Sequence, residues 1–211
     1  MIKHRLDSLS VDLKNYLAEL PKEYQDISAE RKKSLLELSN YIRHRKTRKQ
    51  PIQITVICTH NSRRSHIGQI WLQVAAYCYG IENFQSFSGG TEATAFNANA
   101  VAAMQRTGLQ IEIVTKSQNP IYRIHFSEAA PSFEVFSKLY QADSNPSDSF
   151  AAVMVCTSAD EACPMVIGAD ARFSLPFDDP KAFDGTALET TKYDERSRQI
   201  AREFFFVMSQ V

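Results

Sequence analysis

The sequence predicts an α/β fold in which a parallel sheet has helices on both faces, and three observations support this prediction. Short apolar runs rich in β-branched residues, such as residues 52–58 and 151–156, are typical of buried strands. Between such runs, apolar residues recur at i, i+3, i+4 and i+7, which is the period of an amphipathic helix. Strands that alternate with helices along a chain form parallel sheets covered by those helices.

Length and composition limit the classes of protein that fit this chain. It has 211 residues, 44% of them hydrophobic, and a formal net charge of zero, which argues against nucleic acid or a membrane surface as a partner. No apolar run approaches the roughly 20 residues that span a bilayer, and the first residues lack the apolar core of a signal peptide. We therefore expect a cytoplasmic protein, in which four cysteines suggest catalysis or metal binding before structural disulfides.

Residues 1–50 are predicted to form a helical extension. A single amphipathic helix, ended by Pro21, is expected where leucines recur at helical spacing, namely Leu6, Leu9, Leu13, Leu17 and Leu20. Ser28 is a candidate N-cap for a second helix, which runs into the basic stretch 43–49. This stretch is either a patch for nucleic acid or an acidic partner or, as we favour, a solvated helix end stabilised by the helix dipole. The extension would pack on the main domain, reach beyond it, or form a homodimer.

The main domain is expected over residues 51–211. Its first strand is followed by a helix over 65–79, which Gly80 ends, and then by a strand over 84–88. A loop at Gly89-Gly90 comes next. A second helix is expected from the N-cap Asn97 to Gly108, and an extended piece follows over 110–114.

Residues 115–150 are predicted to be an insertion. Residues 122–126 alternate in hydropathy like an exposed strand, whereas residues 133–140 fit a helix or a strand. After the insertion the chain returns to a buried strand that ends at Cys156. A shorter strand over 172–175 and a final helix with Ile200, Phe204 and Val207 on its apolar face complete the domain.

The junction between the first strand and the first long helix of this domain is a candidate anion site. Residues 58–65 are Cys-Thr-His-Asn-Ser-Arg-Arg-Ser. Backbone amides at a helix N-terminus bind anions, and the helix dipole favours negative charge there. The same amides and Arg64 would stabilise a Cys58 thiolate as a nucleophile, and Arg64 can bind the anion through two parallel hydrogen bonds. The plainer alternative is a buried cysteine that closes a strand. The candidate oxyanion-binding residues are Thr59, His60, Asn61, Ser62, Arg63, Arg64 and Ser65.

Two further cysteines, Cys156 and Cys163, follow the end of another predicted strand. Because parallel strands place their C-terminal ends along one edge of the sheet, Cys156 should lie in the same crevice as Cys58. Three interpretations are open. The first is a zinc site, but this would need a tighter spacing or a nearby histidine, so we expect no metal. The second is that the two thiols are unrelated core residues. The third is a redox relay, in which Cys156 attacks the group attached to Cys58 and Cys163 resolves the product.

A pair of carboxylates, Asp178 and Asp179, follows the 172–175 strand and precedes Pro180. Such a pair is common in plain turns. Its position at a further strand end makes it a candidate general acid over the anion site, where it would protonate a departing oxygen.

These motifs resemble the low-molecular-weight protein tyrosine phosphatase family, with the 58–65 segment near the start of the domain and Asp179-Pro180 near its end. Within that family, the Cys156-x6-Cys163 pair and the Ser-Gly-Gly-Thr-Glu loop at 88–92 are more similar to the thioredoxin-coupled arsenate reductases than to the phosphatases. The resemblance covers residues 52–211. It implies a three-layer sandwich with a central four-stranded parallel sheet.

The resemblance also implies a role for each matching residue. Cys58 would be the nucleophile and Arg64 the residue that clamps the oxyanion. Ser65 would donate a hydrogen bond to the Cys58 thiolate, and Asn61 would hold the loop in a left-handed conformation. Asp179 would be the general acid.

The sequence departs from the family pattern in four places. Gln69 stands where the reductases have an acidic residue associated with a bound potassium ion, so we do not expect that ion site here. His60 stands where the loop usually has glycine, and Arg63 stands where a second loop cysteine is frequent. Lys181-Ala-Phe183 follows Asp179-Pro180, where the phosphatases usually have tyrosines that embrace phosphotyrosine.

The leading hypothesis is an arsenate reductase, an oxidoreductase of arsenical resistance that binds no cofactor and uses thioredoxin as its external thiol reductant. In that branch Cys58 attacks arsenate, Cys156 attacks Cys58 and releases arsenite, and Cys163 moves the redox-active disulfide to Cys156–Cys163, where thioredoxin reduces it. The alternative is a hydrolase, a protein tyrosine phosphatase acting on phosphomonoesters through a Cys58 phosphoenzyme. A third hypothesis is a non-catalytic anion-binding regulatory module.

Overall fold

A four-stranded parallel sheet forms the centre of the molecule. The computed structural model describes residues 2–162 and 165–211. Strands β1 (Ile52–Cys58), β2 (Phe84–Gly90), β6 (Phe150–Met154) and β7 (Ala169–Ser174) lie in the order β2-β1-β6-β7, and all three pairings are parallel. Every residue of the central strands β1 and β6 is buried except Gln53, as near-continuous apolar strands require. The predicted fold class is confirmed.

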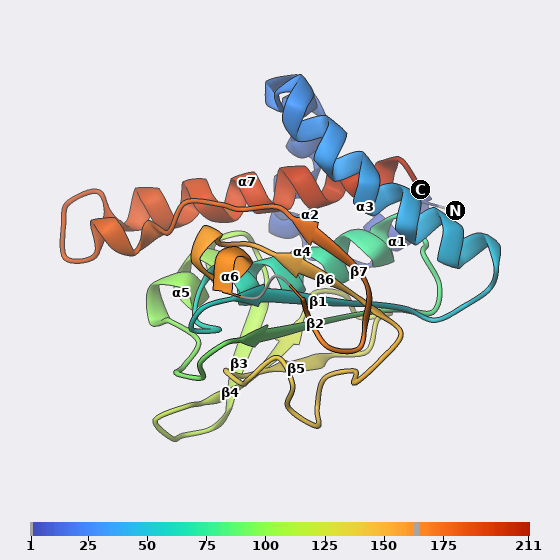
Figure 1. Cartoon of the computed structure of the whole chain (residues 1–211). Helices are drawn as coiled ribbons and strands as arrows, with labels where there is room; N and C mark the ends of the chain where they lie inside the picture. The colour runs from blue at the N-terminus through green and yellow to red at the C-terminus, as the bar shows by residue number, and fades with distance from the viewer. Residues whose placement is uncertain (1, 163–164) are drawn as a thin grey trace.

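Helices pack against this sheet. Helix α4 (Arg64–Cys78) packs on β1 and β2, and α3 (Ala29–Thr47) packs on β1 and β7. Helix α7 (Glu189–Ser209) lies against α3, α4 and α5 (Ala98–Arg106), while the short α6 (Thr157–Ala162) contacts β1 and β6. In Figure 1, α3 and α7 lie above the sheet and the strands of the insertion lie below it.

The N-terminal leucines do not form the single helix that their spacing predicts. The chain forms α1 (Ile2–Asp7), α2 (Val11–Glu19) and a 3₁₀ helix, η1 (Leu20–Asp26). The break occurs because Ser10 caps α2: its hydroxyl accepts a hydrogen bond from the Leu13 N–H at 3.3 Å. Serine side chains that bond to nearby backbone in this way favour a helix start over a helix interior.

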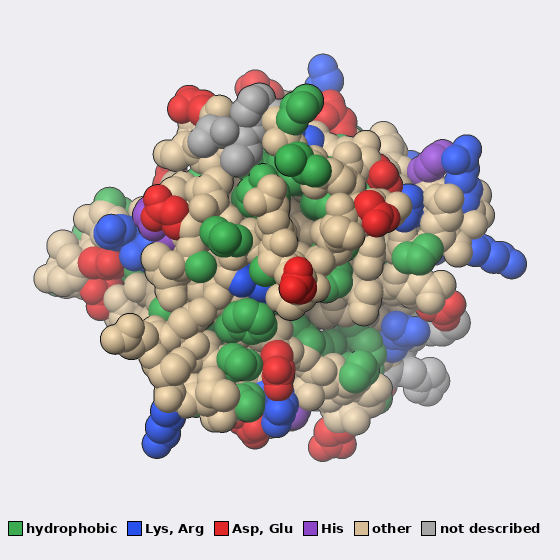
Figure 2. All heavy atoms as spheres, turned by 60° about the horizontal axis from the view of Figure 1, so that its bottom comes forward, with side chains coloured by type: hydrophobic (Ala, Val, Ile, Leu, Met, Phe, Trp, Pro, Cys, Tyr) green, Lys and Arg blue, Asp and Glu red, His purple; other side chains and the backbone are tan. Residues whose placement is uncertain are grey.

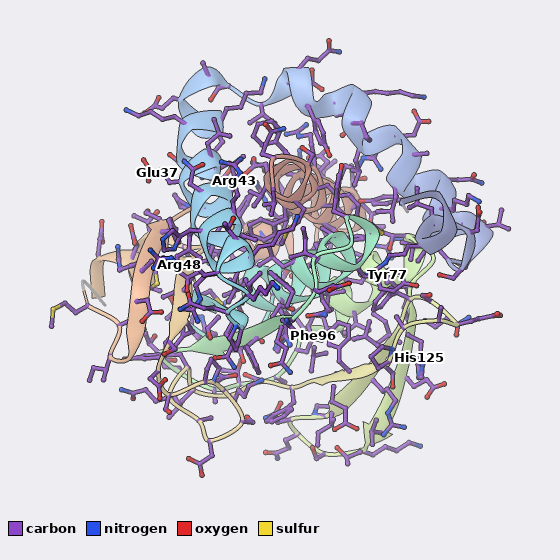
Figure 3. The ribbon with its side chains drawn as sticks, turned by 90° about the vertical axis from the view of Figure 1, so that its right-hand side faces the viewer. Glu37, Arg43, Arg48, Tyr77, Phe96 and His125 are labelled. Carbon is purple, nitrogen blue, oxygen red and sulfur yellow. The ribbon has the colours of Figure 1, made fainter. Side chains whose placement is uncertain are left out.

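Helix α3 begins as predicted at Ser28, whose hydroxyl accepts from the Arg31 N–H at 3.1 Å. The apolar side chains of the extension share one core with the sheet; among them are Leu13, Leu17, Leu20, Leu35, Leu38 and Ile42. The basic stretch forms the C-terminal end of α3, and Figure 3 labels its first residue, Arg43. Within this stretch, Arg45 pairs with Asp170 at 3.0 Å. The division into extension and main domain, and a homodimer through the extension, stay predictions.

An ion pair joins α3 to α7 and gives a test of this packing. The Arg31 Nε lies 2.7 Å from the carboxylate of Glu203, whose side chain is only 2% exposed. Arg31→Leu would leave that carboxylate buried without its cation, so we expect the free energy of unfolding to fall by about 3 kcal/mol, measured by urea denaturation. The control is Lys22→Ala in the exposed Lys22–Glu19 pair, expected to change it by about 0.5 kcal/mol or less. Equal stability of the two variants would contradict the prediction.

The extended piece predicted over 110–114 and the insertion together form a second, antiparallel sheet of three strands, called the inserted sheet below. Strands β3 (Gln110–Thr115), β4 (Ile121–His125) and β5 (Phe133–Val135) lie in the order β3-β4-β5. The predicted alternation is present, and the buried side chains of this segment are Tyr122, Ile124 and Phe126. The ambiguous segment 133–140 is not a helix, because it forms β5 and then bridges to the outer edge of β2 at Gly90 and Leu139.

The predicted loop at Gly89-Gly90 is wrong, because β2 continues through both glycines. They are needed for close approach of neighbouring backbone rather than for a turn. A Cβ at Gly89 would lie 2.3 Å from the Cα of Tyr140. A Cβ at Gly90 would lie 2.6 Å from the Thr59 carbonyl oxygen and 2.7 Å from the Asn61 nitrogen. The end of β2 therefore lies directly against the 58–65 loop.

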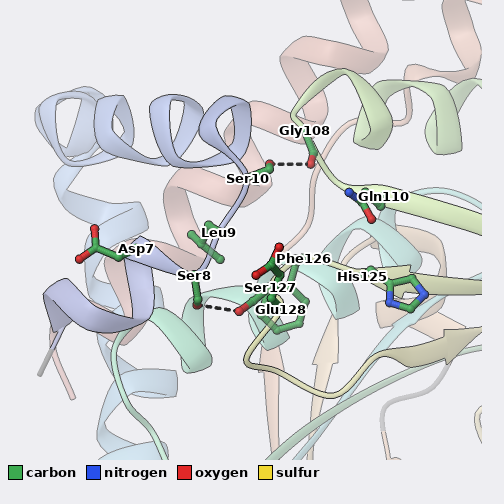
Figure 4. Close-up of a pocket in the computed structure, with 10 residues that line it drawn as sticks. All are labelled: Asp7, Ser8, Leu9, Ser10, Gly108, Gln110, His125, Phe126, Ser127 and Glu128. Atoms are coloured by element: carbon green, nitrogen blue, oxygen red, sulfur yellow. Dashed lines mark hydrogen bonds between the residues drawn. The ribbon is translucent and has the colours of Figure 1, made fainter.

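A cavity of about 290 Å³ lies between the extension and the inserted sheet, and residues of both line it (Figure 4). At its edges, the Ser8 and Ser127 hydroxyls lie 2.7 Å apart, and the Ser10 hydroxyl donates to the Gly108 carbonyl at 3.1 Å. On the face that carries the inserted sheet, acidic and basic side chains are interspersed (Figure 2). No helix in the described part of the chain is both long and apolar enough to cross a membrane.

Candidate active site

The 58–65 loop leaves β1 at Cys58 and enters α4 at Arg64. Asn61 takes a left-handed backbone conformation, with φ of 43°, and its side chain is fully buried. Its amide Nδ2 donates to the Ser65 Oγ at 2.8 Å, and the Ser65 Oγ lies 3.1 Å from the Cys58 Sγ. The nucleophile candidate therefore has a hydroxyl donor within hydrogen-bond distance, and Asn61 orients that hydroxyl.

Neighbouring segments hold the loop from outside through its carbonyl groups. The Thr91 N–H donates to the Cys58 carbonyl at 3.3 Å and the Glu92 N–H to the Thr59 carbonyl at 2.8 Å. The Asn97 N–H donates to the Ser62 carbonyl at 2.9 Å. These bonds engage the loop carbonyls from neighbouring segments, and so hold the loop in a fixed shape.

Arg64 and Asp179 face each other across the mouth of the loop. The Arg64 guanidinium donates to the Asp179 Oδ2 at 2.7 Å and to the Phe177 carbonyl at 2.8 Å. The Asp179 Oδ1 accepts from the Lys181 N–H at 3.1 Å, which fixes the carboxylate at the start of a short 3₁₀ turn. Asp178, by contrast, is 93% exposed and pairs with Arg196. Of the two carboxylates, only Asp179 contacts Arg64 and can serve as the acid.

The Arg63 side chain contacts acidic and phenolic groups. Its Nε donates to the Tyr193 hydroxyl at 3.0 Å, and its other nitrogens lie 3.8 Å from carboxylate oxygens of Asp179 and Asp184. The Tyr193 hydroxyl donates to Asp184 at 2.7 Å, and burial raises the pKa of Tyr193 to about 12, so it stays protonated. The sequence offered no signal for Tyr193, which lies on α7 far from any motif.

The second thiol lies beside the loop. Cys156 follows β6, the strand that pairs with β1, and its side chain is buried. The Cys156 Sγ is 3.4 Å from the Thr59 Oγ1 and accepts from the Ala159 N–H at 3.4 Å. Cys163 lies outside the described residues. Among the described cysteines, Cys58, Cys78 and Cys156 are free thiols.

Cys78 is separate from this site. It is buried on the apolar face of α4, and burial raises the pKa of its thiol to about 12. A thiol of this kind is a core residue with little thiolate at neutral pH.

Beside the loop lies a cavity of about 380 Å³, to which His60 contributes its partly exposed ring. The His60 Nε2 lies 3.6 Å from the Glu92 carboxylate. The other residues that line the cavity are Ser62, Arg63, Thr94, Ala95, Phe96, Asn97, Ala98 and Lys181. Phe96, labelled in Figure 3, also packs on the ring of the buried His66.

His66, the residue after Ser65, is a second feature that the sequence pattern did not indicate. Its ring is fully buried, and its Nδ1 lies 3.2 Å from the Ser88 hydroxyl. Burial, together with the nearby Lys138 ammonium, lowers the pKa of His66 to about 3. His66 therefore stays neutral at neutral pH, and it packs α4 against Phe96 and Ser88 instead of donating protons.

Comparisons with known proteins agree with this geometry. No family model matches the sequence. An arsenate reductase of Bacillus subtilis (strain 168) is 30% identical over 146 residues, which make up 69% of this chain and 86% of that protein.

Solved structures show the same fold at low identity. The low molecular weight phosphotyrosine phosphatase of Vibrio cholerae O395 superposes with a TM-score of 0.51 and 14% identity, covering 75% of this chain and 95% of that one. The low molecular weight protein tyrosine phosphatase of T. tengcongensis gives a TM-score of 0.50 and 16% identity, covering 76% and 99%. The Bacillus subtilis relative, the shared fold and the family order of cysteine, arginine and serine in the loop all support one assignment. This chain belongs to the low-molecular-weight protein tyrosine phosphatase superfamily and is a cysteine-based enzyme of the arsenate reductase or phosphatase type.

Proposed function

We propose that this enzyme reduces arsenate to arsenite through Cys58, Cys156 and Cys163. The observation that carries the proposal is the buried Cys156 Sγ, 3.4 Å from the hydroxyl of Thr59, the residue after the nucleophile. A phosphatase needs no second thiol at this point. A reductase does, because the sulfur–arsenic bond must be broken by sulfur if electrons are to reach the arsenic.

The first step uses the loop. The Cys58 thiolate attacks the arsenic of arsenate while loop N–H groups and Arg64 stabilise the anionic oxygens. Asp179 donates its proton to the departing oxygen, which leaves as water. The product is a sulfur–arsenic(V) adduct on Cys58. Arg64 and Asp179 are 2.7 Å apart, so both can contact a tetrahedral oxyanion at this position.

The second step transfers two electrons. Cys156 attacks the Cys58 sulfur and forms a disulfide, and the electron pair of the sulfur–arsenic bond stays on arsenic, which leaves as arsenite. Cys163 then attacks Cys156, frees Cys58 as a thiolate, and leaves a Cys156–Cys163 disulfide. The dithiol of thioredoxin reduces that disulfide and becomes oxidised itself, so each turnover consumes one reduced thioredoxin.

Hydrolysis of phosphomonoesters is the second candidate function. The 380 Å³ cavity beside the loop favours it, since a free oxyanion as small as arsenate would leave that cavity unused. Its lining includes two cationic side chains, Arg63 and Lys181, and a histidine, and these groups suit a larger phosphorylated substrate. In this chemistry water replaces Cys156 as the group that attacks the Cys58 adduct.

Single cysteine variants distinguish the two functions. Arsenate reduction is measured with thioredoxin, thioredoxin reductase and NADPH, and p-nitrophenyl phosphate hydrolysis is measured in parallel. We expect Cys156→Ser and Cys163→Ser each to lower thioredoxin-dependent arsenate turnover by at least a hundredfold, because each removes one sulfur of the relay. Hydrolysis should change less than twofold in both variants. The matched control is Cys78→Ser, in which a core thiol is lost and both activities should remain.

Two results would count against the reductase. Full arsenate turnover in Cys156→Ser would exclude the relay. Hydrolysis that is lost only in Cys58→Ser, with no arsenate turnover in wild type, would assign the protein as a phosphatase. If the wild type binds phosphate but shows neither activity, the third hypothesis, an anion-binding regulatory module, is correct.

A further inference from the structure

The segment 136–140, at the end of the inserted sheet, contacts the nucleophile loop directly. It passes the outer edge of β2, where the Gly90 N–H donates to the Lys138 carbonyl at 2.9 Å and the Tyr140 N–H donates to the Gly90 carbonyl at 3.0 Å. The segment is fixed at its other end by Asn119, in the turn between β3 and β4. The Asn119 Nδ2 donates to the Ser137 carbonyl at 2.7 Å, and the Asn119 Oδ1 accepts from the Ser137 N–H at 3.1 Å.

Ser137 and Lys138 pass this constraint to the loop. The buried Ser137 hydroxyl donates to the His60 carbonyl at 3.2 Å and accepts from the Thr94 N–H at 2.8 Å. The Lys138 backbone N–H donates to the Asn61 Oδ1 at 2.8 Å. The bonds from Ser137 and Lys138 end on His60 and Asn61, two adjacent residues of the loop, so the segment fixes where the loop turns.

Asn61 is the link to the nucleophile. Its amide has one partner on each side: the oxygen accepts from Lys138, and the nitrogen donates to the Ser65 Oγ at 2.8 Å. That hydroxyl is in turn 3.1 Å from the Cys58 Sγ. Because Asn61 is fully buried and its backbone is in the left-handed region, its amide has no solvent to replace a lost partner. Loss of the Lys138 contact would let the amide rotate and release Ser65.

We propose that Asn119 and Ser137 are positioning residues for the nucleophile: through Lys138, Asn61 and Ser65 they hold the Cys58 loop in its reactive shape. The inference rests on the proposed nucleophilic role of Cys58. It assigns the inserted sheet a function in the chemistry of the site, although neither residue touches the reacting atoms.

The test measures the reactivity of Cys58 without any substrate. Iodoacetamide alkylates the thiolate, and the modified Cys58 peptide is quantified by mass spectrometry at pH 7 over time, in the full-length protein. We expect Asn119→Ala and Ser137→Ala each to slow alkylation of Cys58 about fivefold, the effect of one hydrogen bond of ordinary strength. Turnover, whether of arsenate or of p-nitrophenyl phosphate, should fall by a similar factor in kcat. Ser137→Thr keeps the hydroxyl and should restore both rates to within twofold of wild type.

Arg123→Ala is the matched control. It removes an exposed ion pair with Glu134 on the neighbouring strands of the same sheet and should leave alkylation unchanged. A role in stability alone would lower the melting temperature of Asn119→Ala while Cys58 is alkylated at the wild-type rate, and that result would overturn the inference. Because alkylation needs no turnover, the inference can fail while the proposed reductase stands, and the reverse also holds.

Discussion

Arg64→Lys is expected to lower kcat/KM by about a hundredfold to a thousandfold, for arsenate and for a phosphomonoester alike. A lysine keeps the charge but loses the planar pair of N–H donors that binds two oxygens at once. The Phe177 carbonyl and the Asp179 carboxylate hold the Arg64 guanidinium at the mouth of the loop. A lysine ammonium would lose at least one of these two contacts.

Steady-state kinetics on both substrates provide the measurement. The control is Arg106→Lys, at an arginine that pairs with Asp194 on the surface at 2.6 Å and is 41% exposed. That variant should retain full activity. If Arg64→Lys loses less than tenfold in kcat/KM on both substrates, the arginine is not the oxyanion clamp.

The loop could be predicted from sequence because its residues are local to one another. A buried strand, a helix that starts within the next few residues, and cysteine and arginine at fixed spacing are all contained in residues 52–78. The left-handed Asn61 and the contact of Ser65 with Cys58, which the family resemblance implied, involve residues of that same short stretch. The pair Asp178 and Asp179 was predictable by its strand-end position, which places it at the same edge of the sheet, and the family resemblance singled out Asp179.

Other features were not predictable, because they depend on segments that meet only in the folded chain. Tyr193 reaches Arg63 from α7, and Asn119 reaches the loop through Ser137. Neither residue belongs to a recurring pattern. The glycines of β2 were wrongly predicted to form a loop. Gly89 is explained by the close approach of Tyr140, and this is a tertiary contact that the local sequence does not show. Local propensity favours turns at Gly-Gly, and tertiary packing overrides it here.

Asp179→Asn should lower kcat by about a hundredfold to ten-thousandfold, the range for a positioned general acid, while substrate binding remains. Asparagine keeps the size of the side chain and its oxygen can still accept from Arg64, but it has no acidic proton to transfer to the departing oxygen. The loss should be greatest for arsenate and phenyl phosphate, whose departing oxygens need a proton. It should be smaller for p-nitrophenyl phosphate, because p-nitrophenolate leaves readily without one. A dependence on the leaving group separates the loss of an acid from a general disturbance of the loop.

The neighbouring carboxylate supplies the control. Asp178→Asn changes a side chain that is 93% exposed and paired with Arg196 outside the site, so kcat should stay within twofold of wild type. The two variants differ by one position and carry the same chemical change. A loss in Asp179→Asn that is equal for phenyl phosphate and p-nitrophenyl phosphate would contradict the acid role, since a residue that only orients Arg64 would affect both esters alike. A loss in Asp178→Asn comparable to that in Asp179→Asn would mean that the turn around residues 177–184, and not one carboxylate, determines the rate.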